Sequence, residues 1–157
     1  MKPKVYVETT VISYLTARPS RDLVVAGHQQ VTHEWWQTSR RHFALVSSQL
    51  VVGEAGAGDP EAAQERLAVL GELTLLQISE EALTLAQHLL QTGAIPVGFP
   101  EDALHVAVAV VNGIEYLLTW NYKHLANAGR RSRIEAACHE LGYEPTIICT
   151  PEELMED

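Results

Sequence analysis

Short runs of β-branched and other apolar residues alternate along the chain with segments that have helical apolar spacing. Strands that alternate with helices imply a parallel sheet covered on both faces, because each crossover places a helix against the sheet. The expected fold is an α/β, three-layer α/β/α sandwich with a central, mainly parallel sheet. The runs that we expect to be strands are "KVYVE", "FALVSS", "LTLLQI", "EYLLTW" and "PTIICT".

The segments between these runs carry helix signals. Asp59, followed by Pro, and Ser79 are both suited to cap helices that begin after them. The segment "PEDALHVAVAVVNG" at 100–113 is apolar on nearly all sides, so we expect a central helix there. "TPEE" at 150–153 has the features of one more helix start.

At 157 residues the chain fits one domain, residues 1–157, and can bury a core without disulfides. Its two cysteines, Cys138 and Cys149, make no disulfide framework and no CxxC motif, which favours a cytoplasmic location. The first residues turn polar after three apolar ones, so we expect no signal peptide. No apolar run approaches the roughly 20 residues of a membrane span, so we also expect no membrane partner.

The formal net charge of −9 disfavours a nucleic-acid partner, because phosphate binding normally requires a basic surface. The charge is unevenly distributed, however: residues 1–41 hold six Lys or Arg against three acids, whereas residues 42–118 hold one against ten. The basic residues therefore have two interpretations, as RNA contacts or as solvated helix faces. The candidates for RNA contacts are Lys123, Arg18, Arg40 and Arg41.

Four polar residues fall where predicted strands end and helices follow. Glu8 ends the first strand, and Glu54 lies in the helix after the second. Asp102 opens the helix at 100–113, and Asn121 follows the fourth strand. In open parallel sheets, ligands and chemistry collect at this edge. Structural explanations remain open, since Asp102 can complement a helix dipole and Asn121 can cap a helix at 122–126.

Three carboxylates that converge on one cleft repel one another, so their arrangement is stable chiefly when a cation neutralises it. Oxygen ligands select a hard ion, Mg²⁺ or Mn²⁺, which is normally completed by waters and substrate phosphates. Such an ion activates water and stabilises the charge of a phosphodiester that is being cut. We therefore expect Glu8, Glu54 and Asp102 to hold the ion, with Asn121 as an auxiliary ligand.

Four stretches of the sequence resemble the PIN-domain family, in particular the VapC-like toxins of type II toxin–antitoxin systems. They are "VYVETTVISYL", "SSQLVVGE", "DALHVAVAVVNGIEYLLTWNYKHLAN" and "GYEPTIICTPEEL". The resemblance spans roughly residues 1–154 and implies a metal-dependent endoribonuclease with an acidic pocket. It also implies an RNA substrate cut to 5′-phosphate and 3′-hydroxyl ends, a homodimer, and a small antitoxin partner.

The resemblance places the family's acids on Glu8, Glu54 and Asp102, and its fourth polar position on Asn121. Thr9 stands where the family commonly has a small hydroxyl residue. The chain departs from the family at two positions, because Glu8 replaces the more usual Asp and Asn121 supplies a neutral oxygen where Asp is common. The longer Glu8 side chain places the ion farther from the strand or folds back, and Asn121 makes the pocket less negative, so weaker activity is expected.

Two further residues are candidates for auxiliary roles. Thr119 can orient Asn121 or a water on the ion, or it can be an ordinary strand residue. His105 lies one turn beyond Asp102 and can act as a general acid or as a satisfied histidine in a buried helix. Two alternative functions stay open at this point: a weakened PIN-like module that binds RNA or protein without cutting, and an α/β domain that binds a small molecule.

Overall fold

Five parallel strands form one sheet in the computed structural model, which describes residues 1–155. The strand order is β3-β2-β1-β4-β5, and every neighbouring pair is parallel. The predicted α/β fold class and all five predicted strands are confirmed. The predicted domain extends to residue 157, and its last two residues lie outside the described part. The strands are β1 (Lys4–Val7), β2 (Ala44–Ser48), β3 (Thr74–Leu76), β4 (Tyr116–Leu118) and β5 (Ile147–Cys149).

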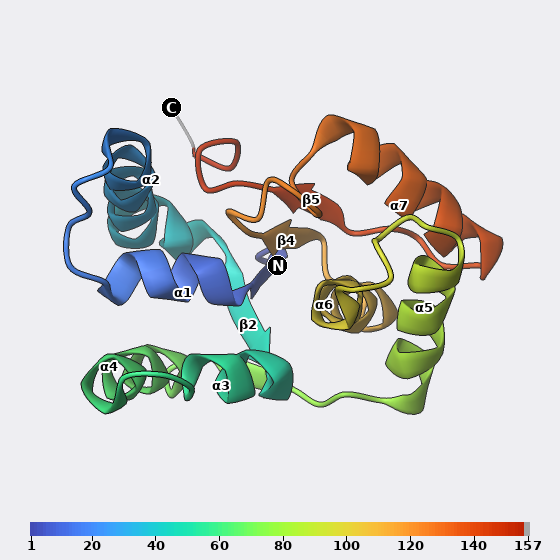
Figure 1. Ribbon diagram of the computed structural model, residues 1–157, viewed down its shortest axis with the longest axis horizontal. Helices are drawn as coiled ribbons and strands as arrows, with labels where there is room; N and C mark the ends of the chain where they lie inside the picture. Colours follow the sequence, from blue (N-terminus) through green and yellow to red (C-terminus); the bar gives the residue numbers. More distant parts are fainter. Residues whose placement is uncertain (156–157) are drawn as a thin grey trace.

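The helices fall into two groups around the sheet (Figure 1). In one group α1 packs against α2, α3 and α4, and in the other α5 packs against α6 and α7. Within residues 1–155, no helix has the length and apolar character that a membrane span requires. The helices are α1 (Thr9–Thr16), α2 (Leu23–Glu34), the π-helical η1 (Trp35–Ser39), the 3-10 helix η2 (Arg40–His42), α3 (Gln49–Ala55), α4 (Pro60–Leu70), α5 (Glu80–Gln91), α6 (Pro100–Val111) and α7 (Ala128–Glu140).

The helix starts follow the capping signals of the sequence. The Asp59 carboxylate accepts a hydrogen bond from the backbone N–H of Ala62 at 3.0 Å, and the Ser79 hydroxyl accepts one from Ala82 at 3.2 Å. Residues 105–110 of α6 are all buried, which confirms the prediction of a central helix.

The segment after β5 differs from its prediction. Residues 151–154 form a turn, although a helix was expected to begin there. The capping signal itself is used, because Thr150 N–H donates to the Glu153 carboxylate at 3.0 Å and Glu153 N–H donates to the Thr150 hydroxyl at 3.3 Å. These reciprocal bonds close one turn without propagating a helix.

Strand β1 lies in the middle of the sheet and positions the candidate site. Its residues Val5, Tyr6 and Val7 are fully buried. It pairs with β2 on one side and with β4 on the other, so the chain segments that follow these three strands emerge side by side at one edge of the sheet.

Candidate functional site

Glu8 lies directly after β1 and is buried, with 5% of its surface exposed. Its backbone N–H donates to the Leu118 carbonyl at 3.1 Å, which holds the end of β1 against β4. Its Oε1 atom accepts hydrogen bonds from the hydroxyls of Thr10 at 2.5 Å and Thr119 at 2.6 Å. A buried carboxylate is costly unless donors satisfy it, so these two threonines fix where the Glu8 side chain points.

Glu54 approaches Glu8 from α3, the helix that follows β2. The Ser48 hydroxyl caps this helix at the Val51 N–H. The Oε1 atom of Glu54 accepts a hydrogen bond from the Thr9 hydroxyl at 2.5 Å and contacts His105 Nε2 at 2.8 Å. The side chain is 32% exposed, so Glu54 faces both the interior and solvent.

A buried chain of side chains fixes the ring of His105. Its Nδ1 atom lies 2.8 Å from the Tyr6 hydroxyl, which lies 2.7 Å from the Ser48 hydroxyl. Burial raises the pKa of Tyr6 far above its usual value, and nearby carboxylates add to the effect. The phenol therefore stays neutral and keeps its proton for this chain of contacts.

The pKa values of His105 and Glu54 move in opposite directions. Burial lowers the pKa of His105, but the hydrogen bond to Glu54 and the charges of the neighbouring carboxylates outweigh it, so the pKa lies above its ordinary value. Burial raises the pKa of Glu54, but the hydrogen bond and charge of His105 and the Thr9 hydroxyl outweigh it, so the net shift is downward. Both shifts favour an ion pair between the two side chains.

Glu8, Glu54 and His105 bring one ligand atom each to within 4.8 Å of one another. Both hydrogen bonds of Glu8 end on Oε1, and so do both contacts of Glu54. Within residues 1–155, the Oε2 atom of each carboxylate is therefore left without a hydrogen bond. Two such oxygens fit a divalent ion such as Mg²⁺ or Mn²⁺, since carboxylates suit both ions, whereas both ring nitrogens of His105 already contact Tyr6 and Glu54.

Asp102 lies in the first turn of α6 and pairs with a histidine that sequence reasoning missed. Its Oδ2 atom is 2.8 Å from His124 Nδ1, and the Phe99 ring packs on His124 with a centroid separation of 3.9 Å. Within the described residues, the close group of ligand atoms contains His105 in place of Asp102. His124 stands only three residues after Asn121, so its position in the strand-end segment was the available signal.

Asn121 uses its side chain to cap the turn that follows β4. Its Oδ1 atom accepts a hydrogen bond from the His124 N–H at 3.1 Å, and its own N–H donates to the Thr119 hydroxyl at 3.0 Å. Residues 122–125 form a turn where a helix was considered. The Asn121 side chain therefore caps the turn, as one of its two interpretations expected. Any contact between Asn121 and an ion must use the remaining lone pair of Oδ1.

The four basic candidates lie in different places. Lys123 is exposed in the turn beside Asn121, at the edge of the sheet where β1 ends and Glu8 follows. Arg18 lies beyond the far end of α1, roughly 12 Å along a helix of eight residues. Arg40 and Arg41 precede β2, so they lie at the amino edge of the sheet, opposite the site, and the Arg40 guanidinium stacks on a tryptophan ring at 4.2 Å.

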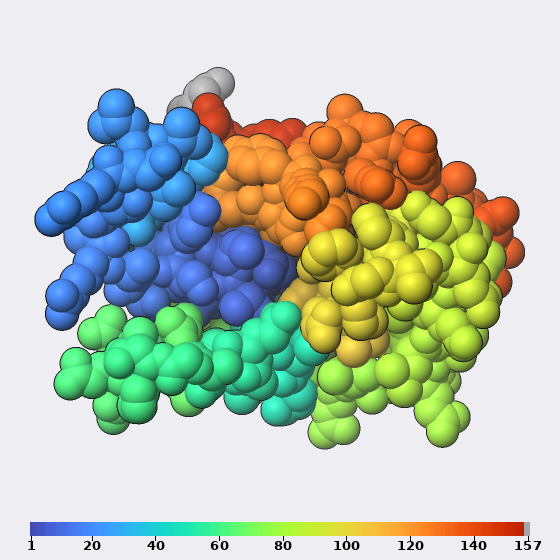
Figure 2. All heavy atoms as spheres, viewed as in Figure 1, coloured from blue at the N-terminus to red at the C-terminus, as the bar shows by residue number. Residues whose placement is uncertain are grey.

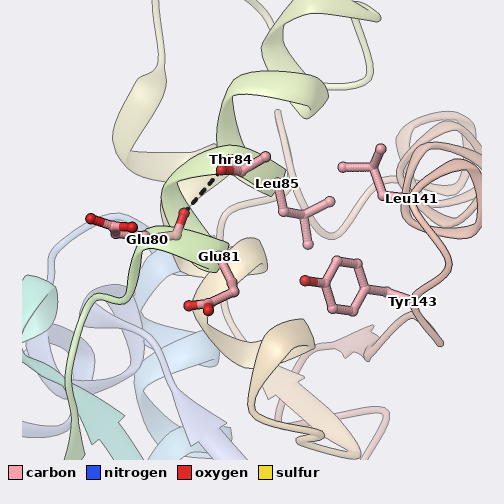
Figure 3. A pocket seen from close by; sticks show the side chains of 6 residues that line it. All are labelled: Glu80, Glu81, Thr84, Leu85, Leu141 and Tyr143. Carbon is pink, nitrogen blue, oxygen red and sulfur yellow. Dashed lines mark hydrogen bonds between the residues drawn. The ribbon is translucent and has the colours of Figure 1, made fainter.

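The face of the molecule in Figure 2 presents the start of α1 at its centre, bordered by α3, by α6 and by the segment that follows β4. A cavity of about 400 Å³ lies elsewhere, between α5 and the segment after α7 (Figure 3). It contains none of the predicted site residues. Its lining residues are Glu80, Glu81, Thr84, Leu85, Leu141 and Tyr143.

Comparisons with known proteins identify the fold. No family model matches the sequence, and no curated protein matches it. A chain of VapBC2 from Rickettsia felis, solved bound to a DNA fragment from its promoter, matches with a TM-score of 0.60 at 15% identity, covering 94% of this chain and 98% of that chain. A chain of VapBC-1 from nontypeable Haemophilus influenzae matches with a TM-score of 0.59 at 16% identity, covering 95% and 98%.

These two matches span nearly the whole of both chains, and at this low identity they establish the fold. The chain is a three-layer α/β/α domain whose strand ends carry buried and half-buried carboxylates. More particularly, its fold is that of a VapC-like PIN domain, which agrees with the resemblance found in the sequence.

Proposed function

We propose that this protein is a Mg²⁺- or Mn²⁺-dependent endoribonuclease and the toxin of a toxin–antitoxin pair. The observation that carries the proposal is the convergence of Glu8 and Glu54 with His105 at the carboxyl edge of a VapC-like sheet. Carboxylates gathered at that edge suit metal-assisted hydrolysis of a phosphodiester better than the binding of an apolar small molecule.

The side chains divide the work of the proposed site. Glu8 and Glu54 would hold the ion through their Oε2 atoms, while the threonine hydroxyls keep both Oε1 atoms in place. Asp102 would add a third negative charge on the α6 side, oriented by His124. When bound, a divalent ion supplies an activated water and neutralises charge on the phosphodiester.

Three residues serve the site indirectly in this proposal. His105 orients Glu54 and is itself held by Tyr6. Asn121 keeps the turn after β4 closed, which places His124 against Asp102.

Of the basic candidates we retain Lys123 as a phosphate contact, because it lies at the same edge of the sheet as Glu8. Arg40 and Arg41 lie at the other edge.

Cleavage of single-stranded RNA tests the proposal. Purified protein should cut a labelled oligoribonucleotide with Mn²⁺ or Mg²⁺, stop with EDTA, and lose activity in Glu54→Gln and Asp102→Asn. Arg41→Ala is the matched control, since it removes an exposed cation at the far edge and should cut as wild type does, whereas Lys123→Ala should cut more slowly. Activity that persists in Glu54→Gln, or that is indifferent to EDTA, would refute the metal-dependent mechanism.

A second candidate function is a PIN-like module that binds RNA without cutting it. One observation favours it: Asp102 and Asn121 already have partners, because His124 contacts both side chains. This function predicts RNA binding with no cleavage at any concentration of either ion, and calorimetry should then show no binding of Mn²⁺ at millimolar concentration.

Partners and location are also proposals. The antitoxin is supported by the fold that this chain shares with VapBC chains. A homodimer is supported by an apolar groove between α5 and α6 that contains Leu83, which is 53% exposed, together with Leu90, Pro100 and Leu104. Sedimentation of the purified protein should show a dimer that Leu83→Glu converts to a monomer. A cytoplasmic location stays a prediction.

A further inference from the structure

Four aromatic rings gather beside the carboxylates, on the side of α1 and α2. Trp120 is buried and His28 stacks on it, with a centroid separation of 4.3 Å and an interplanar angle of 14°. Tyr14 stacks on the same indole at 6.2 Å. The Tyr122 ring lies 5.4 Å from the His28 ring and is the outermost of the four, since Tyr122 is 43% exposed.

Two polar contacts hold the rings of this aromatic cluster (Tyr14, His28, Trp120 and Tyr122) in place. The indole N–H of Trp120 donates to the Thr32 hydroxyl at 2.7 Å, and the Tyr122 hydroxyl lies 3.4 Å from His28 Nε2. An exposed ring with such a backing needs little ordering when a flat ligand stacks on it, so most of the stacking energy is available for binding.

The cluster is joined to the candidate site by one threonine. The backbone N–H of Trp120 donates to the Thr10 hydroxyl at 2.9 Å, and that hydroxyl donates to Glu8 at 2.5 Å. Tyr122 is three residues after Thr119, so their Cα atoms are at most about 10 Å apart. A stacked strand rises roughly 3.4 Å per nucleotide, so the backbone of Tyr122 lies within about three nucleotides of Thr119, whose hydroxyl contacts Glu8.

Resting on the ribonuclease function proposed above, we infer that Tyr122 is a base-stacking subsite for single-stranded RNA. A base two or three nucleotides from the cut would stack on its exposed ring, and the adjacent Lys123 would contact the phosphate between them. Glu152 and Glu153 lie close enough to act on Tyr122, and Arg131 pairs with Glu153 at 2.8 Å. The uncharged base, not the phosphate, is therefore the part of the nucleotide that suits this ring.

Binding of a fluorescent 12-nucleotide oligoadenylate tests the inference. The measurements use the Glu54→Gln background so that the RNA is not cut, and they compare intact RNA with a series in which one abasic site is moved along the strand. Tyr122→Leu removes the ring and should weaken binding of intact RNA by about 5- to 150-fold, the range expected for one lost base–aromatic stack. Tyr122→Phe keeps the ring and should stay within about twofold of its parent.

The abasic series separates stacking from a structural effect of the substitution. In the parent protein, which keeps Tyr122, an abasic site at one position of the strand should weaken binding by the same factor as Tyr122→Leu does. In Tyr122→Leu the same abasic site should cause no further loss of affinity. Equal binding of intact and abasic RNA, or an unchanged affinity in Tyr122→Leu, would overturn the inference; equal binding is also what docking of a protein partner on this surface predicts.

Failure of the subsite and failure of the nuclease function have different signatures. If wild-type protein cuts RNA with Mn²⁺ and Tyr122→Leu cuts it with the same KM and kcat, the nuclease function stands and the subsite falls. If the wild-type protein cuts no RNA, the nuclease function falls, while a ring-dependent loss of binding would still support stacking on Tyr122. Thermal melts should show little change for Tyr122→Phe and a modest loss for Tyr122→Leu, because the ring is 43% exposed and its covered part packs on the His28 ring.

Discussion

Replacing Thr119 by Val should destabilise the protein without creating a cavity. Thr119 is fully buried, and its hydroxyl donates to Glu8 at 2.6 Å while it accepts the Asn121 N–H at 3.0 Å. Valine has nearly the same shape, so the substitution mainly removes these two hydrogen bonds, together with a longer contact of 3.4 Å to the Thr10 hydroxyl.

The size of the effect follows from the two bonds. A hydrogen bond to a charged group contributes about 1.5–3 kcal/mol, and one between neutral groups contributes about 0.5–1.5 kcal/mol. Thr119→Val should therefore lower the free energy of unfolding by about 2–4.5 kcal/mol. Thr119→Ser keeps the hydroxyl and loses one methyl group, so it should cost only about 1 kcal/mol.

Urea unfolding followed by tryptophan fluorescence measures both values without any ion present. Titration with Mn²⁺ gives a second readout, because a misplaced Glu8 should reduce the affinity by about 10- to 100-fold in the valine variant and much less in the serine variant. The reasoning is refuted if Thr119→Val costs less than about 1 kcal/mol, or if Thr119→Ser costs as much as Thr119→Val.

Three further predictions concern His105, Asp102 and Glu8. The raised pKa of His105 adds stability that is fully present below its unfolded pKa of about 6.5 and is lost as the pH rises through its folded pKa. The urea midpoint of the wild-type protein, measured from about pH 5 to about pH 9, should therefore fall on the alkaline side. The midpoint of His105→Gln should not show this fall. Asp102→Asn removes the charged partner of His124 and should cost about 1.5–3 kcal/mol in the same assay, even without an ion. Glu8→Asp should lower both stability and Mn²⁺ affinity by calorimetry, because a carboxylate that is shorter by one methylene group cannot reach the hydroxyls of Thr10 and Thr119.

The fold could be predicted because its signals are local. Strand β1 is recognisable from three consecutive apolar residues, and all three are buried since the strand is covered on both faces. The same holds for α6, whose apolar residues on every side reflect a helix that is buried along 105–110. Periodicity along the chain records such burial directly.

The positions of the acids were predictable, but their partners were not. Glu8 and Glu54 could be placed at one edge because parallel strands end together. Their hydrogen bonds connect residues that are far apart in the sequence, such as Glu8 with Thr119, 111 positions away, and Glu54 with His105, 51 positions away. Only the packed structure determines which side chain meets which.

The direction of the strands decides at which edge of the sheet each basic residue lies, and a count of charges along the sequence does not show this. Arg40 and Arg41 form a basic pair in the sequence, yet they stand before β2, and residues that precede a parallel strand lie at the edge away from the residues that follow it. Lys123 follows β4 and shares the edge of Glu8. Position relative to a strand end therefore shows which basic residues share an edge with the carboxylates, and local charge density does not.

The acid cluster also shows how carboxylates can gather without depending on an ion. Repulsion between three carboxylates is expected to require a cation, but each acid here has a donor of its own. Glu8 has two hydroxyls, Glu54 has a hydroxyl and His105, and Asp102 has His124. Because these donors already offset the repulsion, chelation should remove activity while leaving the protein folded. An ion would then act on the substrate rather than on the fold, which allows a site of this kind to be assembled before the metal binds.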